Sequence, residues 1–395
     1  MRFTSILLSW FLAVMGFASA AVLPQGVYDR NGQAIYVGVE HELPDPASND
    51  FFDPQTQHTG SLAHAGGLRL RTGVQEERRV VVMRQGHLGV SLYFLDAKPR
   101  STVILVHGND PETREMGFLI PYFVTNGVNV ISYDQRGTGE STGNWFLNGP
   151  IDRANDVDAI YDAFRSDPHV DGKRIGIWGF SNGGWTAPIV AVRRPLAFMI
   201  LKSAPAESLA ANIDYEVRQV MRRHGESAAA TQQALALWRS VESALNGTSS
   251  WTSAQRAYSA ASSQPWFRLM PKIEVPPKST AYADGLRRAV SYDPAKTLQE
   301  VRTPTLALYG ALDRNVDVAD SSVLMPRYFA AAGMRDFTMR VYQHAGHQLI
   351  VSTTGYNGDA LPPERFVPGY PEIMLSWLEQ RGFMQSGSVA RSPRR

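Results

Sequence analysis

The sequence predicts an α/β protein with a mostly parallel sheet of eight strands, helices on both faces of the sheet and an inserted helical cap. Strand-like apolar runs alternate with helical patterns along most of the chain, which is typical of a parallel sheet covered on both sides. One strand run passes through a glycine-flanked serine, Ser181, into a helical pattern. The strand runs also stop for roughly a hundred residues between Lys202 and Pro304, which is too long for a simple connection and indicates an inserted domain.

The N-terminus has the pattern of an export signal. Arg2 precedes an apolar stretch over 6–17, and Ala18-Ser-Ala20 follows it. The stretch is too short to span a bilayer comfortably, so we predict a signal peptide cleaved after Ala20, with an uncleaved anchor as the alternative. A secreted or periplasmic protein, with no stable membrane insertion after cleavage, is expected.

The chain is predicted to divide into five parts. Asn31-Gly32 favours a tight hairpin turn within an N-terminal accessory region, and the Ser-rich C-terminus with its clustered arginines has the composition of a disordered tail. The predicted parts are a signal peptide, an accessory region, an α/β core in two pieces, a helical cap and a tail, over residues 1–20, 21–78, 79–203 with 304–384, 204–303 and 385–395.

Runs of β-branched and aromatic residues mark the predicted strands, and most are separated by helical patterns. The strands are predicted over 80–84, 90–95, 102–106, 128–133, 174–178, 197–202, 305–309 and 337–342. The helices are predicted over 115–125, 151–165 and 182–192 in the core, and over 213–224 and 227–245 in the cap.

Ser181 is the predicted nucleophile. It lies in Gly179-Phe-Ser-Asn-Gly183, and small neighbours let a strained strand-to-helix turn close around a serine. Such a turn exposes the hydroxyl at a helix N-terminus, where free N–H groups stabilise an oxyanion. Ser141 lies in a second match, Gly139-Glu-Ser-Thr-Gly143, but within a polar loop that does not lead into a helix. The alternative for Ser181 is a glycine-rich turn without catalytic function.

A nucleophilic serine requires a base and an acid that orients the base. Asp313 follows the predicted strand 305–309, and His347 follows the predicted strand 337–342 in a loop that contains glycine. The chain order Ser, Asp, His is expected when these groups meet at the carboxyl edge of one parallel sheet. We therefore predict His347 as the base and Asp313 as the acid.

Three further residues compete for these roles. His344 follows its strand too closely to reach over the sheet edge. Asp317 and Asp320 lie where a new segment begins and have the position of helix N-caps.

The oxyanion hole is predicted to combine two backbone N–H groups. One belongs to Asn182, which follows the nucleophile, and the other to Asn109, which follows His107-Gly108 at the end of the strand 102–106. Gly108 allows the chain to approach the reacting carbonyl closely. His107 precedes that glycine, so we expect it to shape the loop rather than act as a base.

Five motifs carry a resemblance to a known family. They are His107-Gly108, Tyr133-Asp-Gln-Arg-Gly-Thr-Gly-Glu-Ser-Thr-Gly143, Ser181-Asn-Gly-Gly-Trp185, Asp313 and His347. Over about residues 79 to 383 the chain resembles the α/β-hydrolase superfamily, and within it the bacterial serine hydrolases termed dipeptidyl-aminopeptidase or acylaminoacyl-peptidase-like. The resemblance implies the α/β-hydrolase fold and a serine hydrolase with a Ser-His-Asp triad, but this fold hosts many substrates. Asn109-Asp110 stand where relatives commonly carry small residues.

Composition excludes several classes of function. The net charge of +2 is near neutral, so no nucleic-acid partner is indicated. The absence of cysteine excludes disulfides, lipid-modified cysteine and thiolate metal sites. No His-Glu-x-x-His motif occurs, so we expect neither a metal nor another cofactor.

The cap is expected to decide the substrate. Its aromatic residues include Trp238 and Trp266, which either pack within the cap or line an apolar substrate site. Glu216 and Asp214 are candidates to hold a substrate ammonium group, with a solvated helix face as the alternative.

These observations together predict an exported serine hydrolase that cleaves a carboxylic ester through an acyl-enzyme. An aminopeptidase or acyl-peptidase that acts on short peptides is the alternative, and a catalytically inactive binding protein is a third possibility. The expected partner is accordingly a small-molecule ester or a short peptide. The sequence does not indicate an oligomeric state.

Overall fold

A sheet of eight strands forms the centre of the molecule. The computed structural model describes residues 73–270, 281–356 and 366–384, together with the backbone of five short strands nearer the N-terminus. The central strands are β6 (Gln75–Met83), β7 (Gly86–Phe94), β8 (Arg100–Val106), β9 (Asn129–Tyr133), β10 (Val170–Phe180), β11 (Met199–Lys202), β12 (Thr305–Gly310) and β13 (Phe337–Tyr342).

The strand order places β8, β10, β11 and β12 in the middle of the sheet. The order is β13-β12-β11-β10-β8-β9-β7-β6. All pairs from β13 to β9 are parallel, whereas β7 pairs antiparallel with both β9 and β6. The carboxyl ends of the parallel strands therefore meet at one edge, where open α/β sheets place their ligand sites.

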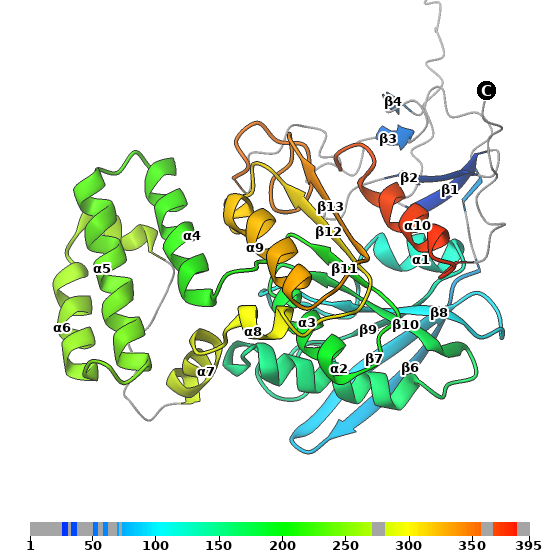
Figure 1. The fold of residues 1–395 in the computed structure, drawn as a ribbon, viewed down its shortest axis with the longest axis horizontal. Helices are drawn as coiled ribbons and strands as arrows, with labels where there is room; N and C mark the ends of the chain where they lie inside the picture. The colour runs from blue at the N-terminus through cyan, green and yellow to red at the C-terminus, as the bar shows by residue number, and fades with distance from the viewer. Residues whose placement is uncertain are drawn as a thin grey trace, which may run out of the picture.

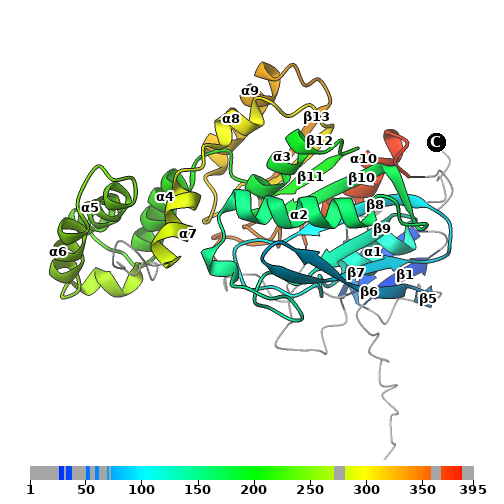
Figure 2. The ribbon, with the colours of Figure 1, turned by 90° about the horizontal axis from the view of Figure 1, so that it is seen from below.

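Helices cover both faces of this sheet (Figure 2). Two apolar cores separate the sheet from its helices, one with α2 (Pro150–Phe164), α3 (Gly183–Arg193) and α9 (Val318–Ala331), the other with α1 (Leu119–Thr125) and α10 (Tyr370–Gln380). The central strands are apolar on both sides, as parallel strands between two helical layers must be. The prediction of an α/β-hydrolase sheet with helices on both faces is confirmed.

Four helices extend to one side of the sheet and form what we call the cap (Figure 1). These are α4 (Leu209–Arg223), α5 (Ala228–Leu245), α6 (Trp251–Ala261) and α7 (Ala281–Val290), with a short 3-10 turn, η3 (Pro265–Leu269), after α6. A serine begins each of the first three: the hydroxyls of Ser208, Ser227 and Ser250 accept a hydrogen bond from a backbone N–H of the first turn. A short helix, α8 (Pro294–Leu298), then leads back to β12.

All eight predicted strands are present, with small shifts at their ends. β6 begins at Gln75, so the last residues assigned to the accessory region belong to the central sheet. β10 is longer than predicted at both ends and spans Val170–Phe180. α2 begins at Pro150, one residue before its predicted start, and the 3-10 turn η2 (Trp145–Leu147) ahead of it was not predicted.

The N-terminal strands form a separate sheet of order β4-β3-β2-β1-β5. Its strands are β1 (Gly26–Arg30), β2 (Gln33–Val37), β3 (Asp50–Asp53), β4 (His58–Ser61) and β5 (Arg69–Leu70). β1 and β2 pair antiparallel, with Arg30 opposite Gln33, on either side of the predicted turn at Asn31-Gly32. The predicted signal at 1–20 and tail at 385–395 lie outside the described residues. Within the described part of the chain, no helix has both the length and the apolar character needed to cross a bilayer.

Candidate active site

Ser181 lies on a sharp turn between β10 and α3. Its φ of 51° is in the left-handed region, where a side chain is disfavoured and the surroundings must hold the backbone. Close packing explains the glycines on either side. A Cβ atom added to Gly179 would lie 2.7 Å from the Gly183 carbonyl oxygen. A Cβ atom added to Gly183 would lie 2.6 Å from the Val106 carbonyl oxygen. The turn therefore closes only around small residues, as the motif predicted.

A chain of hydrogen bonds joins Ser181 to His347 and Asp313. The Ser181 hydroxyl donates to His347 Nε2 over 2.9 Å, and His347 Nδ1 donates to Asp313 Oδ2 over 2.8 Å. Asp313 and His347 are only 2% and 6% exposed. The predicted nucleophile, base and acid are thus in direct contact at the carboxyl edge of the sheet.

The Asp313 carboxylate is fixed from its other side as well. Its Oδ1 accepts hydrogen bonds from the backbone N–H groups of Asn315 and Val316, at 2.8 and 2.9 Å. The cap also reaches this residue, since the Tyr215 hydroxyl in α4 donates to the Asp313 carbonyl over 2.7 Å. Burial, reinforced by the Asp313 charge, raises the pKa of Tyr215 to about 12, so Tyr215 is a hydrogen-bond donor at neutral pH.

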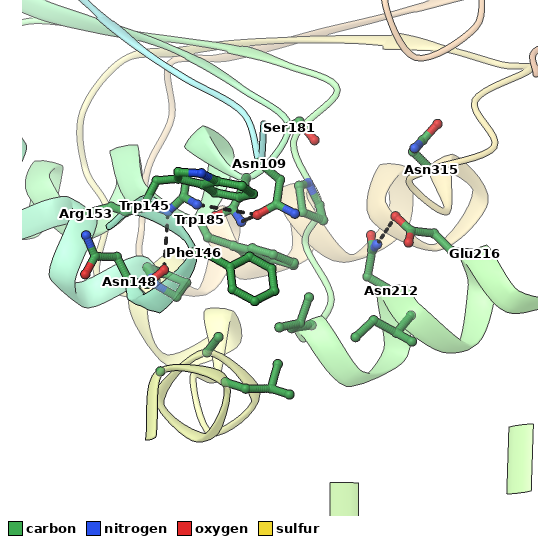
Figure 3. Close-up of a pocket in the computed structure, with 18 of the residues that line it drawn as sticks. Asn109, Trp145, Phe146, Asn148, Arg153, Ser181, Trp185, Asn212, Glu216 and Asn315 are labelled. Atoms are coloured by element: carbon green, nitrogen blue, oxygen red, sulfur yellow. Dashed lines mark hydrogen bonds between the residues drawn. The ribbon is translucent and has the colours of Figure 1, made fainter. Parts of the chain in front are cut away.

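Asn109 lies next to Ser181 (Figure 3), and Asn182, the residue after Ser181, lines the same cavity. The Asn182 side-chain amide donates to Asn109 Oδ1 over 3.1 Å. Arg153 in α2 donates to the Gly108 carbonyl over 2.7 Å and thereby supports the loop from below. Burial lowers the pKa of the Arg153 guanidinium. The two residues predicted to donate to an oxyanion are therefore joined to each other and to a buried cation.

A cavity of about 400 Å³ opens in front of Ser181. Figure 3 shows Arg153 and Glu216 on opposite sides of it. Most of the lining side chains are apolar, and they come from both the core and the cap. The apolar lining residues are Trp145, Phe146, Pro150, Trp185, Pro205, Leu209, Ile213, Tyr282, Leu286, Ala289 and Val316.

Comparison with protein families assigns the chain to one family. Residues 97–353, well over half of the chain, match the family described as serine aminopeptidase, S33. The chain belongs to this S33 family. It is accordingly a serine hydrolase with the α/β-hydrolase fold, as the sequence motifs predicted. No curated protein matches the sequence.

Solved structures with a similar course of the chain have little sequence in common with this S33 hydrolase. An esterase from Pyrococcus furiosus is 14% identical with a TM-score of 0.49, over 79% of this chain and 92% of the esterase. Dipeptidyl peptidase 4 from Porphyromonas gingivalis is 16% identical with a TM-score of 0.46, over 90% of this chain and 41% of that protein.

Glu216 is the acidic side chain of α4 that the S33 hydrolase places in the cavity. Its Oε1 accepts a hydrogen bond from the Asn212 amide over 3.0 Å. Burial, with the nearby Asp313 charge adding to it, raises the pKa of Glu216 to about 7. The other candidate, Asp214, does not line the cavity and forms an ion pair with Arg239 at 2.8 Å.

The prediction that Trp238 and Trp266 contact substrate is wrong. Trp238 is fully buried in an apolar cluster between α5, α6 and α7, and Trp266 is buried in a second cluster between α4 and α5. Neither lines the cavity. Their large rings fill these two apolar clusters in the interior of the cap.

Other aromatic residues line the cavity instead. They are Trp145 and Phe146 in η2, Trp185 in α3 and Tyr282 in α7. The Phe146 and Tyr282 rings stack at 5.2 Å and thereby join the core to the cap. A sequence signal existed for three of them, since loops after the carboxyl ends of parallel strands form ligand sites and Trp145, Phe146 and Trp185 follow β9 and β10.

The competing residues have structural roles. The Ser141 hydroxyl donates to the Asp134 carbonyl and accepts from the Gly89 N–H. His107 is buried between Glu112 and the Tyr133 carbonyl. His344 is exposed on the surface, and Asp317 is the N-cap of α9, three residues before the predicted cap Asp320.

One cluster in the described residues has the composition of a metal site. Glu77, Asp167 and His169 bring their potential ligand atoms within 4.8 Å of one another. Arg79 forms ion pairs with both carboxylates. The guanidinium therefore already offsets part of the negative charge of the cluster, whose residues lie near β6 at the edge of the sheet and do not line the cavity.

Proposed function

We propose that this S33 hydrolase cleaves a carboxylic ester, with Ser181 as nucleophile, His347 as base and Asp313 as the acid that orients His347. The observation that carries the proposal is the hydrogen-bonded chain of these three residues at the floor of a largely apolar cavity. A neutral ester needs only an apolar pocket and an oxyanion hole, both of which the cavity residues can supply.

The proposed reaction proceeds through an acyl-enzyme. The Ser181 oxygen attacks the ester carbonyl carbon while His347 Nε2 takes the hydroxyl proton, and the carbonyl oxygen becomes an oxyanion that the N–H groups of Asn109 and Asn182 stabilise. The C–O bond to the alcohol then breaks, and the alkoxide leaves with the proton from His347. Water, deprotonated by His347, hydrolyses the acyl-Ser181 ester and returns the free enzyme.

A panel of substrates with two histidine variants tests this proposal. We expect wild type to hydrolyse aryl esters of increasing acyl length faster than aminoacyl anilides, and to react with a fluorophosphonate probe at Ser181. Ser181→Ala and His347→Ala should each lower kcat by about 10⁴. His344→Ala is the matched control, since this histidine is exposed and should leave kcat unchanged. Wild-type turnover in Ser181→Ala would contradict the mechanism, and a chain without probe labelling would be an inactive binding protein.

An aminopeptidase is the second candidate, because Glu216 brings a carboxylate into the cavity and the family description names that activity. A carboxylate at this position could pair with the ammonium group of a peptide N-terminus. Faster cleavage of aminoacyl anilides than of esters, lost in Glu216→Gln, would favour this candidate over the esterase.

We also propose that the protein is exported through the signal at residues 1–20. The support is the apolar stretch followed by Ala18-Ser-Ala20. Expression of the full chain in a bacterium, followed by fractionation and mass measurement, should give a product outside the cytoplasm that begins at Ala21. An intact Met1 in the membrane fraction would indicate an anchor instead.

A further inference from the structure

The end of β11 lies directly beneath the loop that carries His347. β11 pairs with β10, which leads to Ser181, and with β12, which leads to Asp313. Its last residue, Lys202, and the following Ser203 are both fully buried. The Ser181 N–H donates to the Lys202 carbonyl over 3.0 Å, so this strand end already fixes the backbone of the nucleophile.

Ser203 holds the backbone of His347. Its hydroxyl donates to the His347 carbonyl over 2.7 Å, while its own N–H donates to the Leu308 carbonyl in β12 over 2.8 Å. Ser203 has a φ of 49°, a left-handed conformation that costs a serine free energy and is maintained only where the surroundings require it. A glycine would adopt this φ without strain, but it would have no hydroxyl to donate.

Lys202 holds the residue after the histidine. Its ammonium group donates to Gln348 Oε1 over 3.2 Å. It also lies over several aromatic faces, with the Phe180 ring centre at 4.7 Å and the Tyr370 ring centre at 5.4 Å. The Phe180 ring in turn contacts the His347 ring, with 5.0 Å between the ring centres. Cation–π contacts and the hydrogen bond together fix the ammonium group in one place.

We propose that Ser203 and Lys202 are positioning residues for His347. This inference rests on the proposed function, because it assigns them to the base of that mechanism. His347 lies in a loop, and a displacement of its ring by about 1 Å can cost on the order of 100-fold in rate. Ser203 fixes the loop backbone at His347, and Lys202 fixes the neighbouring Gln348, so the imidazole stays within reach of both Ser181 and Asp313.

Two substitutions at Ser203 separate the hydroxyl from the backbone strain. Ser203→Ala removes the hydroxyl and keeps the strain, whereas Ser203→Gly removes the hydroxyl and relieves the strain. If the hydroxyl positions His347, both variants should lower kcat for an aryl ester by about 10-fold or more with KM unchanged, whatever their unfolding temperatures. A kcat per fluorophosphonate-titrated site equal to wild type in either variant would overturn the role of Ser203.

A double variant shows whether the effect passes through His347. In the His347→Ala background, Ser203→Ala should leave the residual hydrolysis of an activated ester unchanged within about twofold, because no imidazole is left to position. The same loss in both backgrounds would mean a general structural role. Wild-type turnover in His347→Ala would instead refute the proposed function itself, so the two failures are distinguishable.

Lys202 is tested together with its partner. Lys202→Met keeps the apolar length of the side chain, and Gln348→Ala removes the acceptor at a partly exposed position. Each should lower kcat several-fold with KM unchanged, and the double variant should lose no more than the larger single loss. Multiplying losses, or a wild-type kcat in Gln348→Ala, would exclude Lys202 from the positioning role.

Discussion

Two serines at the carboxyl edge of the sheet hold a backbone conformation that favours glycine. Ser181 has a φ of 51° and Ser203 a φ of 49°, and each such residue costs about 1–3 kcal/mol. Ser181 points its hydroxyl at His347 Nε2, and Ser203 points its hydroxyl at the His347 carbonyl. The strained residues therefore lie on either side of the same histidine, where hydrogen bonds maintain them.

Asp313→Asn is predicted to lower kcat by about 10⁴ without unfolding the protein. The amide can still accept from the Asn315 and Val316 N–H groups, so the local fold persists. Its NH₂ group, however, donates toward His347 Nδ1 and moves the imidazole proton to Nε2, where it blocks deprotonation of Ser181. Steady-state kinetics with an aryl ester measure the loss, and circular dichroism checks the fold. A decrease of less than tenfold would show that Asp313 does not orient the base.

At the residue scale, the sequence was informative where chemistry restricts residue type and uninformative where only shape matters. Ser181, Asp313 and His347 were predicted together because glycines, strand ends and chain order constrain them. Trp238 and Trp266 were placed wrongly, since a tryptophan looks the same in a core as in a pocket wall. Whether a side chain on a cap helix faces the core or the cavity depends on how the helices pack, and the local sequence pattern does not predict that packing.

At the scale of single elements, α4 connects the cap to the chemistry. Tyr215 touches Asp313, and Glu216, one residue later, lines the cavity. Consecutive side chains on a helix point about 100° apart, so Tyr215 and Glu216 reach different parts of the site, whereas Val217 and Met221 pack into the cap. Any movement of this helix would alter the cavity and the surroundings of Asp313 together.

Glu216 is predicted to favour cationic esters more strongly as the pH rises. Burial raises the pKa of Glu216 to about 7, so the carboxyl group is neutral below that pH and negative above it. A choline ester and its uncharged dimethylbutyl analogue have the same shape. The ratio of their kcat/KM values should therefore increase in favour of the choline ester as pH rises through about 7, and the ratio cancels every pH effect that the two substrates share.

Glu216→Gln is the control for that measurement, because it keeps the size and the contact with Asn212 but cannot ionise. The ratio should then stay constant with pH. A ratio in wild type that does not change between pH 6 and about 8 would show that Glu216 does not face the substrate.

Trp238→Ala is predicted to destabilise the cap without altering substrate preference. Trp238 is fully buried among α5, α6 and α7, and removing a large buried ring costs about 3–5 kcal/mol. Urea denaturation should show this loss, while the relative kcat/KM values across the ester panel stay as in wild type. Phe146→Ala is the matched comparison: this ring is 48% exposed and lines the cavity, so it should change ester preference with little loss of stability. A changed ester preference in Trp238→Ala, with little loss of stability, would instead place Trp238 at the substrate site.

Among the elements, strands were predicted better than helices. The central strands are apolar on both faces, so a short β-branched run between polar turns identifies each of them. The cap helices α6 and α7 were missed, although the apolar residues of both recur at helical spacing. η2 was missed because three residues of 3-10 turn have no period to detect.

At the scale of the whole molecule, the parallel sheet brings distant parts of the chain together. Residues at 181, 313 and 347 follow β10, β12 and β13, and Lys202 ends the intervening β11. The strand order was not in the sequence pattern itself. The rule that strand-helix-strand units cross over with one hand restricts the possible orders but does not select one.

Removal of metal ions is predicted to leave turnover unchanged. The proposed mechanism moves one proton between Ser181, His347 and the leaving group, and no step calls on a cation. Ester hydrolysis after incubation with EDTA and desalting should match the untreated enzyme. A loss that Zn²⁺ or Ca²⁺ reverses would contradict this mechanism and direct attention to Glu77, Asp167 and His169.

The cap begins and ends at neighbouring points. Leu209, the first residue of α4, and Val290, the last of α7, pack into the same apolar cluster, and α8 alone completes the crossover from β11 to β12. An inserted segment whose two ends lie close together can be replaced by another segment, because the flanking backbone need not move to accept the new insert. The residues proposed for hydrolysis stay with the sheet, whereas residues 209–290 carry only the cap side of the cavity wall, opposite core residues such as Phe146. Evolution, or a laboratory library, can thus alter the cap side of the cavity by exchanging one segment of the chain, while the residues proposed for hydrolysis are kept.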